Sequence, residues 1–252
     1  MRLTDREIHA YLRSSVRSRE REQIGPFLAT FSPHSDNPFL NYAIPDDDAN
    51  PSPDDVTALI AAYRRRGRKP RLEYLPGAAP NVEGALLAGG FTVEGRLPLM
   101  TCMAGQERDV PAPPGIELLV ATEEPELFAA LAVQDEAYGE PGPLTPAEME
   151  RVRGSVEAGS IYVLARDAAT GEPAGAGLCA IPHGGIAEIA AIGVRPAFRR
   201  RGIAAALAAR LAREASAAGV TRPFLMAEGA AEERIHARAG FVTTSEMLHI
   251  SY

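Results

Sequence analysis

The sequence predicts an α/β protein built from two domains. Segments with strand-like and helix-like hydrophobic patterns alternate along the whole chain, which is typical of this class. The 252 residues are long for one compact domain and comfortable for two of ordinary size. A stretch rich in Pro and Gly at 111–115 separates two halves, and a strand-like run at 116–120 begins directly after it. We therefore predict domains at 1–110 and 111–252.

The first half combines capped helices with short strands. Ser52 and Pro53 favour a helix start, and the apolar residues that follow recur at helical spacing. We expect, in order, a helix from Thr4 or Asp5 to about residue 18, strands at 27–31 and 39–44, a helix beginning at 52–55, a strand at 71–75, a helix at 79–88, and one or two strands within 91–103.

The second half contains longer helices. Gly219 is a natural C-cap for the longest of them. After the strand at 116–120 we expect helices at 124–138 and 146–158, strands at 161–166, 174–181 and 186–194, a helix at 204–218, a strand at 224–227, a helix at 230–239, and closing strands within 241–250.

The two halves share a short internal repeat. A strand beginning near residue 71 is followed by a helix and then by Gly90-Phe91. A strand beginning near residue 222 is followed by a helix and then by Gly240-Phe241. Both segments end in a further strand, so we interpret the chain as a duplicated domain.

Composition excludes several classes of protein. The net charge of −7 is not typical of a general nucleic-acid binder, and no apolar run is long enough to span a membrane. The charged N-terminus lacks a secretory signal pattern. Cys102 and Cys179 lie too far apart for a metal knuckle, and the pattern favours reduced thiols in a cytoplasmic protein. Lys69 is the single lysine among 26 basic residues, a bias that indicates a bacterium rich in G and C.

The most informative segment joins a predicted strand to a predicted helix at 192–204. The strand ends at Val194, and Pro196 stops further pairing because it has no N–H to donate. Gly202 and Ala204 then begin a long helix whose free N–H groups and positive dipole end suit an anion. The pattern is neither the dinucleotide fingerprint nor a P-loop. It reads Arg199-x-x-Gly202-x-Ala204, with Ala239-Gly240-Phe241 further along.

Residues 116–252 resemble the GNAT superfamily of acyl-CoA-dependent N-acetyltransferases in this motif and in the order of their elements. The resemblance implies two GNAT-like domains, each with a central mixed β-sheet flanked by helices. It implies that the first is degenerate and has lost the pyrophosphate loop. The run Arg64-Arg65-Arg66-Gly67 copies the letters of the motif but ends a predicted helix, so we do not interpret it as a second site.

The resemblance also implies how acetyl-CoA binds. The pantetheine arm would pair with backbone groups of Ile192, Gly193 and Val194. The pyrophosphate would rest on the amides and positive charge at the start of the following helix, provided by Arg199, Arg200, Arg201, Gly202, Ile203, Ala204 and Ala205. No metal is expected, because the histidines near the N-terminus lack acidic or cysteine partners at ligand spacing.

Two residues are candidates for acid–base catalysis. Glu188 is the lone charge in the strand at 186–194, where family members often carry a base that acts through water; it either performs that role or faces solvent. His236 stands where the family usually has a Tyr that protonates the CoA sulfur. It either donates a proton, a role that an imidazolium can perform near neutral pH, or merely fills the space of the Tyr ring. Tyr138 and Glu136 are weaker candidates for the acceptor pocket.

The predicted function is N-acetyl transfer from acetyl-CoA to a primary amine by direct attack in a ternary complex. The acceptor would be a small molecule or a peptide, which the acidic chain attracts in general terms if it is cationic. The alternative is a non-catalytic acyl-CoA-binding sensor or interaction module, since the His for Tyr exchange departs from the family pattern. Nucleic acid and membrane are not expected as partners, and the protein would be a monomer or a homodimer.

Overall fold

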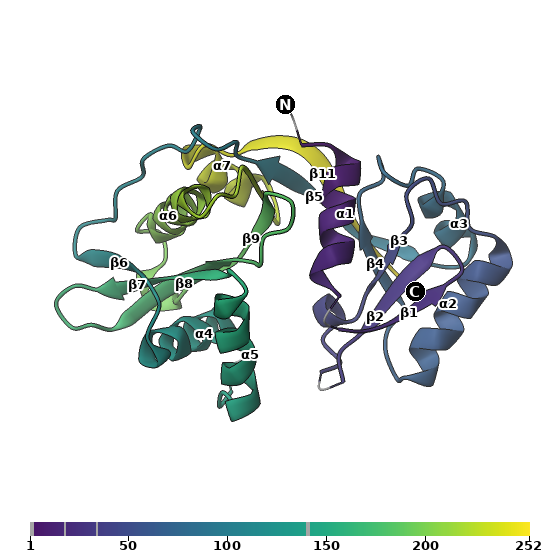
Figure 1. Cartoon of the computed structure of the whole chain (residues 1–252), viewed down its shortest axis with the longest axis horizontal. Helices are drawn as coiled ribbons and strands as arrows, with labels where there is room; N and C mark the ends of the chain where they lie inside the picture. The colour runs from purple at the N-terminus through teal and green to yellow at the C-terminus, as the bar shows by residue number, and fades with distance from the viewer. Residues whose placement is uncertain (1–2, 18, 34, 140–141) are drawn as a thin grey trace. The chain divides into compact units, whose positions relative to one another are not determined.

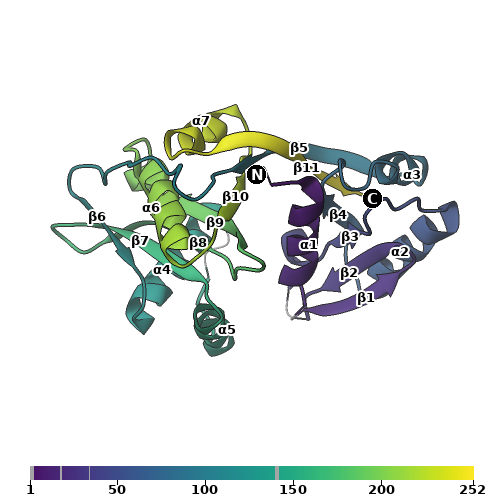
Figure 2. The same ribbon diagram turned by 45° about the horizontal axis from the view of Figure 1, so that its top comes forward.

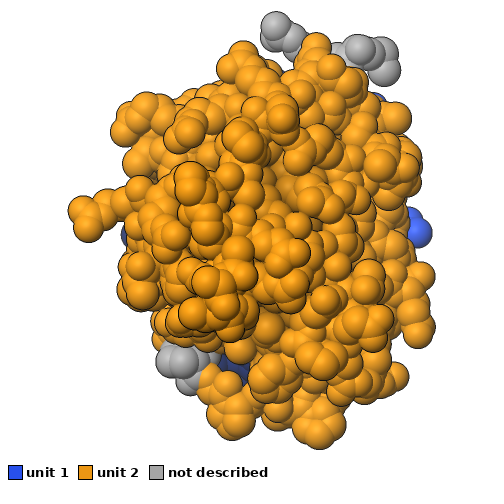
Figure 3. Space-filling view, turned by 90° about the vertical axis from the view of Figure 1, so that its left-hand side faces the viewer, with its two compact units in different colours: residues 1–99, 244–252 blue, residues 100–243 orange. Residues whose placement is uncertain are grey.

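The computed structural model describes residues 3–17, 19–33, 35–139 and 142–252. The chain divides into two compact units (Figure 3). Unit 1 comprises Met1–Leu99 together with Thr244–Tyr252, and unit 2 comprises Met100–Thr243. The boundary between the units lies between Leu99 and Met100, earlier in the chain than the predicted boundary at 110/111. The last nine residues of the chain belong to the first unit rather than the second.

Unit 1 is a mixed sheet with helices on both faces (Figure 1). Its hydrogen-bonded strand order is β1-β2-β3-β4-β11-β5, with β3 parallel to β4 and the β1–β2, β2–β3 and β11–β4 pairs antiparallel. Its elements are α1 (Asp5–Ser15), β1 (Glu20–Ile24), β2 (Phe27–Phe31), the 3-10 helix η1 (Pro38–Leu40), β3 (Ala43–Pro45), α2 (Pro53–Arg65), β4 (Arg71–Tyr74), α3 (Val82–Ala88), β5 (Thr92–Thr101) and β11 (Val242–Ser251), the last two continuing into unit 2.

Three sequence expectations differ from unit 1. The strand expected at 39–44 is replaced by η1 and the shorter β3, because Pro38 begins a turn and the Asn37 side chain accepts a hydrogen bond from the Phe39 N–H. β1 was not expected, since its polar sequence carries no apolar alternation. α1 ends at Ser15; its expected end, residue 18, lies outside the described residues.

The C-terminal strand completes the core of unit 1. Leu248 and Ile250 of β11 are fully buried beside Leu72 and Tyr74 of β4, in the same apolar cluster as residues of α2 and α3. Successive side chains of a strand point to opposite faces. Arg71, Glu73 and His249 therefore lie on the other face of this sheet.

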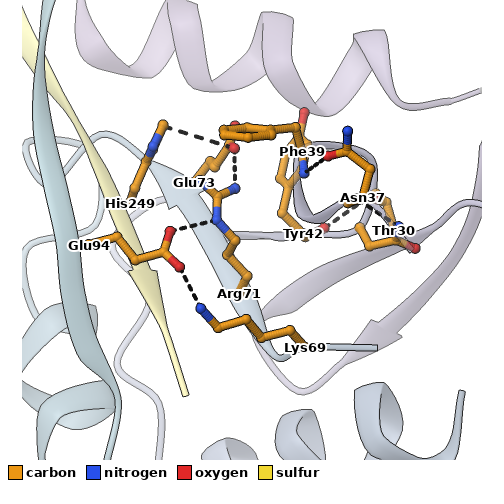
Figure 4. A network of polar contacts seen from close by, with 10 residues as sticks. Thr30, Asn37, Phe39, Tyr42, Lys69, Arg71, Glu73, Glu94 and His249 are labelled. Carbon is orange, nitrogen blue, oxygen red and sulfur yellow. Dashed lines mark hydrogen bonds and ion pairs between the residues drawn. The ribbon is translucent and has the colours of Figure 1, made fainter. Parts of the chain in front are cut away.

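That second face carries a polar network in which Arg71, Glu73 and His249 are buried (Figure 4). The Arg71 guanidinium pairs with Glu73 and, at 2.8 Å, with Glu94, whose other oxygen binds Lys69. Arg71 also lies 4.8 Å from the centroid of the Phe39 ring. Burial and the Arg71 charge lower the pKa of His249 to about 4, so its ring is neutral near pH 7.

Unit 2 contains the remaining strands of this hydrogen-bonded sheet. The last residues of β5 continue beside β10, followed by β9, β8, β7 and β6 in that order. Its remaining elements are β6 (Ile116–Val120), α4 (Glu124–Tyr138), α5 (Pro146–Glu157), β7 (Ile161–Asp167), β8 (Pro173–Cys179), β9 (Ile186–Val194), the 3-10 helix η2 (Pro196–Phe198), α6 (Ile203–Ala217), β10 (Arg222–Met226) and α7 (Ala230–Arg238).

Helices cover both faces of this sheet within unit 2. α6 lies on one face, and α4 and α5 lie on the other (Figures 1 and 2). The α6 face forms an apolar cluster that includes Ala187 and Ile189 of β9 with Leu207 and Leu211 of α6. The α4 face forms a second cluster that includes Leu127, Ala130 and Val133. Glu188 and Ala190 alternate with the first set, so they are on the α4 side.

The structure contains two copies of the internal repeat. β4, α3 and β5 form the first copy and β10, α7 and β11 the second, and a glycine with positive φ follows each helix, Gly90 at 91° and Gly240 at 106°. In both copies the N–H of the following Phe donates to a carbonyl five residues earlier, that of Leu86 or His236. In both copies the strand before the helix is parallel to its preceding neighbour.

Among the described helices, none is both long enough and apolar enough to cross a bilayer.

We expect acid to destabilise the protein partly through His249. Its folded-state pKa of about 4 lies below the unfolded value near 6.5, so unfolding takes up a proton between these pH values. The stabilisation is complete above pH 6.5 and is lost as the pH falls towards 4, by up to about 3 kcal/mol. An NMR titration of the His249 ring measures the midpoint directly. A midpoint near 6.5, or an unchanged pH dependence of unfolding in His249→Gln, would contradict this expectation.

Candidate active site

The site begins where β9 loses its second neighbour. β9 pairs in parallel with β10 from Ile186 to Glu188, and no pairing follows beyond Phe224 of β10 in the described part of the chain. On its other side β9 stays paired with β8 as far as Val194. One edge of β9 between Ile189 and Val194 is therefore open for a ligand that carries its own amide groups.

This open edge contains a β-bulge. Leu178 of β8 pairs with Ala190 and Ala176 pairs with Gly193, so Gly177 faces both Ala191 and Ile192. Ala191 has φ of +52°, a region that a residue with a Cβ rarely adopts. Beyond the bulge, Ile192 and Val194 pack against the α6 cluster. The predicted pantetheine-binding residues thus lie on a distorted stretch of strand.

The loop after β9 leads into α6, whose N-terminus has no side-chain cap. Arg200 has φ of +63° and Gly202 has φ of +91°, which turn the chain sharply before α6. The backbone N–H groups of residues 200–205 have no hydrogen-bond acceptor among the described residues, and Gly202 offers no side-chain cap. Free N–H groups at the positive end of a helix dipole are chemically suited to an anion.

The three arginines of this loop differ in their contacts. The Arg199 Nε donates to the Val194 carbonyl at 3.0 Å, so this side chain links the loop to the end of β9 through a hydrogen bond. The Arg201 guanidinium lies 5.4 Å from the centroid of the buried Phe198 ring. Arg200 is exposed. All three side chains are exposed and could offer positive charge to an anion, and Arg199 and Arg201 also contact the loop itself.

The corresponding helix of unit 1 does not offer such a site. α2 follows β3, but Ser52 caps it and the Asp55 carboxylate accepts hydrogen bonds from Ser52 in return. These hydrogen bonds lower the pKa of Asp55, which keeps a negative charge at the helix start. Arg64 and Arg65 lie in the last turn of α2. The run Arg64-Arg65-Arg66-Gly67 therefore ends a helix, as predicted, although its letters resemble the motif.

Glu188 lies on β9 just before the open edge. Its side chain is half-buried on the α4 side of the sheet, and it is thus neither a freely exposed surface charge nor a core residue. Burial and the Glu188 carboxylate raise the pKa of Cys179 to about 12. That thiol stays protonated near pH 7 and is a poor nucleophile.

His236 is a buried residue of α7. Its side chain is 6% exposed, its ring lies edge-on to Phe241 at 6.4 Å, and its Nδ1 has no partner among the described residues. Burial lowers the pKa of His236, although the Glu232 carboxylate opposes this. The neutral imidazole therefore predominates near pH 7, which disfavours the imidazolium that the predicted acid role requires.

The weaker candidates lie at the end of α4. Tyr138 is 56% exposed, and loss of solvent around part of its ring together with the carboxylates of Glu228 and Glu232 raises its pKa. Glu136 forms an ion pair at 2.8 Å with the Nε of Arg195. The backbone N–H of Arg195 donates to the Ala174 carbonyl. Glu136 therefore ties α4 to the loop after β9.

No group of three or more His, Cys, Asp or Glu residues suited to a metal ion is found within the described ranges. The site is built from backbone groups and single side chains.

Gln134 is a site residue that the sequence prediction missed. It lies on the buried face of α4 and is 6% exposed, and its Nε2 donates to the Ala191 carbonyl at 2.9 Å. The available signal was a polar residue beside Ala130 and Val133 on an otherwise apolar helix face. A buried polar side chain needs a partner, and here the partner is the bulge of β9.

Comparison with known proteins supports the resemblance to the GNAT superfamily. Residues 127–241 match the model of the Acetyltransferase (GNAT) family. The match spans α4 to the start of the last strand and includes the open edge of β9, the loop and α6. A comparison with curated proteins finds no match.

Solved structures extend the similarity to the whole chain. A GCN5-related N-acetyltransferase from Kribbella flavida superposes with a TM-score of 0.80 at 25% identity, covering 100% of this chain and 96% of its own. Two further structures share the fold. One from Sphaerobacter thermophilus has a TM-score of 0.61 at 22% identity, with coverages of 73% and 59%. A tandem GNAT protein from the clavulanic acid biosynthesis pathway has a TM-score of 0.57 at 16% identity, with coverages of 78% and 67%.

We expect Gly202→Glu to weaken acetyl-CoA binding at least about tenfold, because it places a carboxylate where the anion binds and strains a position with φ of +91°. Isothermal titration calorimetry with acetyl-CoA measures the effect. Gly67→Glu is the matched control: Gly67 also follows three arginines and has φ of +64°, but it lies beyond the end of a helix. Equal affinities of the two variants would contradict the placement of the anion.

Proposed function

Since residues 127–241 form an acetyltransferase domain of the GNAT family, we propose that this protein transfers an acetyl group from acetyl-CoA to a primary amine. The observation that carries the proposal is the continuity of two features: the open edge of β9 leads directly into the uncapped N-terminus of α6. An acyl-CoA needs both, because its pantetheine arm contains amides and its pyrophosphate is an anion.

In this proposal the cofactor lies along β9. The amides of the pantetheine arm pair with backbone groups of Ile192, Gly193 and Val194. The pyrophosphate accepts hydrogen bonds from the N–H groups of residues 200–205, and Arg200 adds positive charge. Helix dipole and backbone donors together stabilise such an anion without a metal ion.

Transfer proceeds by direct attack within a ternary complex. The neutral amine nitrogen forms a bond to the thioester carbonyl carbon, and the C–S bond then breaks. The amine loses one proton, and the departing CoA thiolate gains one. No covalent enzyme intermediate is required, so the contribution of the protein is orientation and proton transfer.

Glu188 is the proposed base. It lies beside the open edge on the α4 side, and a carboxylate there can take the proton of the amine through a water molecule. His236 is retained as a candidate for protonating the thiolate. Its lowered pKa weighs against a standing positive charge, so a buried space-filling role is the competing interpretation.

The proposed acceptor is a small-molecule or peptide amine. The chain carries a net charge of −7, and Glu228 and Glu232 lie near Tyr138. This electrostatic setting favours a cationic acceptor, which must lose a proton before it reacts.

The test of the proposal is turnover across a panel of primary amines. Release of free CoA thiol from acetyl-CoA is followed with each amine, and a reaction without amine measures simple hydrolysis. We expect amine-dependent thiol release with at least one class of acceptor. Tight acetyl-CoA binding without turnover on any amine would favour the alternative, a non-catalytic acyl-CoA sensor.

We expect Glu188→Gln to lower kcat about a hundredfold, the lower limit for loss of a general base, while the Kd for acetyl-CoA stays unchanged. The rate should recover in part at high pH, where more of the amine is already neutral. Steady-state kinetics against pH measure both effects. Glu117→Gln, on β6 of the same sheet, is the control. A kcat within twofold of wild type would remove Glu188 from the mechanism.

A further inference from the structure

One polar side chain reaches the β9 bulge from the helix that covers it. Gln134 comes from α4, where its neighbours Leu127, Ala130 and Val133 are buried in an apolar cluster. Its Nε2 lies 2.9 Å from the Ala191 carbonyl oxygen. Because a carbonyl can only accept, the amide nitrogen of Gln134 must face it, and the orientation of the amide group is fixed by chemistry.

The helix approaches the strand closely at this point. A Cβ added to Gly193 would lie 2.6 Å from the Cβ of Ala137 and 3.7 Å from the Cα of Gln134. Glycine at 193 is therefore what lets α4 pack directly on the bulge. Gln134 is thereby brought within reach of a carbonyl that the bulge has taken out of the regular ladder.

The hydrogen bond opposes a local strain. Ala191 has φ of +52°, a left-handed conformation that is strained for a residue with a Cβ. Its carbonyl would add a desolvation penalty if it were buried without a donor. Gln134 supplies that donor, so it stabilises the strained conformation against a regular strand.

Fixing this carbonyl also fixes the next amide. The Ala191 C=O and the Ile192 N–H belong to one planar trans peptide and point in opposite directions. With the carbonyl held by Gln134, the Ile192 N–H is directed away from the Gln134 side chain. Ile192 is the first of the three residues to which the pantetheine arm is assigned.

We propose that Gln134 is a positioning residue for the acyl-CoA: it holds the Ala191–Ile192 peptide in the orientation that the pantetheine arm requires. The inference rests on the proposed function, because it concerns the same open edge of β9. Gln134 acts through the bulge rather than on the reacting atoms. Its loss should therefore affect binding of acetyl-CoA more than binding of the amine.

The test uses Gln134→Met, which keeps the length of the side chain and removes the donor. We expect the Kd and KM for acetyl-CoA to rise about three- to tenfold, the effect of one lost hydrogen bond, with the KM of the amine unchanged. Leu127→Met, a substitution on the same buried face with no polar contact, is the control. Circular dichroism and thermal unfolding establish that both variants are folded.

Two further variants separate positioning from packing. In Gln134→Glu a protonated carboxyl can donate to Ala191 and an ionised one cannot, so the ratio of its Kd to that of wild type should increase with pH. Adding Ala191→Gly to Gln134→Met should restore part of the affinity, because glycine adopts positive φ without the Cβ penalty. Both readouts remain available if Gln134→Met alone folds poorly.

The outcomes distinguish this inference from the function on which it rests. If wild type binds acetyl-CoA and folded Gln134→Met binds it equally well, the positioning role is wrong and the proposed function stands. The positioning role is equally wrong if Gln134→Glu shows a ratio independent of pH and Ala191→Gly restores nothing. If wild type does not bind acetyl-CoA, the proposed function fails and the inference fails with it.

Discussion

β9 has hydrogen-bonding neighbours on both sides as far as Glu188 and on one side thereafter, and the rest of the candidate site depends on that change. A strand paired on both sides has no backbone groups left for a ligand. By parting from β10 after three residues, β9 frees an edge that points towards the start of α6. The same change leaves Glu188 at the last fully paired position, next to the exposed backbone.

The two units illustrate how one supersecondary unit can keep its shape while its chemistry changes. In unit 1 the helix after β3 starts with a capping box, in which the Ser52 and Asp55 side chains each accept from the other residue's backbone N–H and Asp55 adds negative charge. In unit 2 the helix after β9 starts with Gly202, which leaves those groups free. Leu86 and His236 occupy equivalent places, each accepting from the Phe that follows the glycine. His236 thus occupies the position that a buried apolar side chain, Leu86, occupies in the other copy.

Much of the architecture followed from local patterns. α2 and α5 begin at Pro53 and Pro146, each directly after a capping Ser or Thr. The loop between β9 and α6 was predicted from a strand ending at Val194 and a helix beginning after Gly202, and β9 and α6 end and begin at these positions. β1 and the turn at η1 were missed, because a polar strand has no hydrophobic period and Pro38 converts an apolar run into a turn.

The sequence by itself determined the class of fold, the duplicated unit and the loop that precedes α6, because these depend on residues adjacent along the chain. Tertiary structure decided the rest. It assigned residues 244–252 to unit 1, lowered the pKa of His236 by burial, and brought Gln134 to Ala191, 57 residues further along. Pairing, burial and a hydrogen bond to a bulge arise between segments far apart in sequence. No local pattern specifies which of those segments will meet.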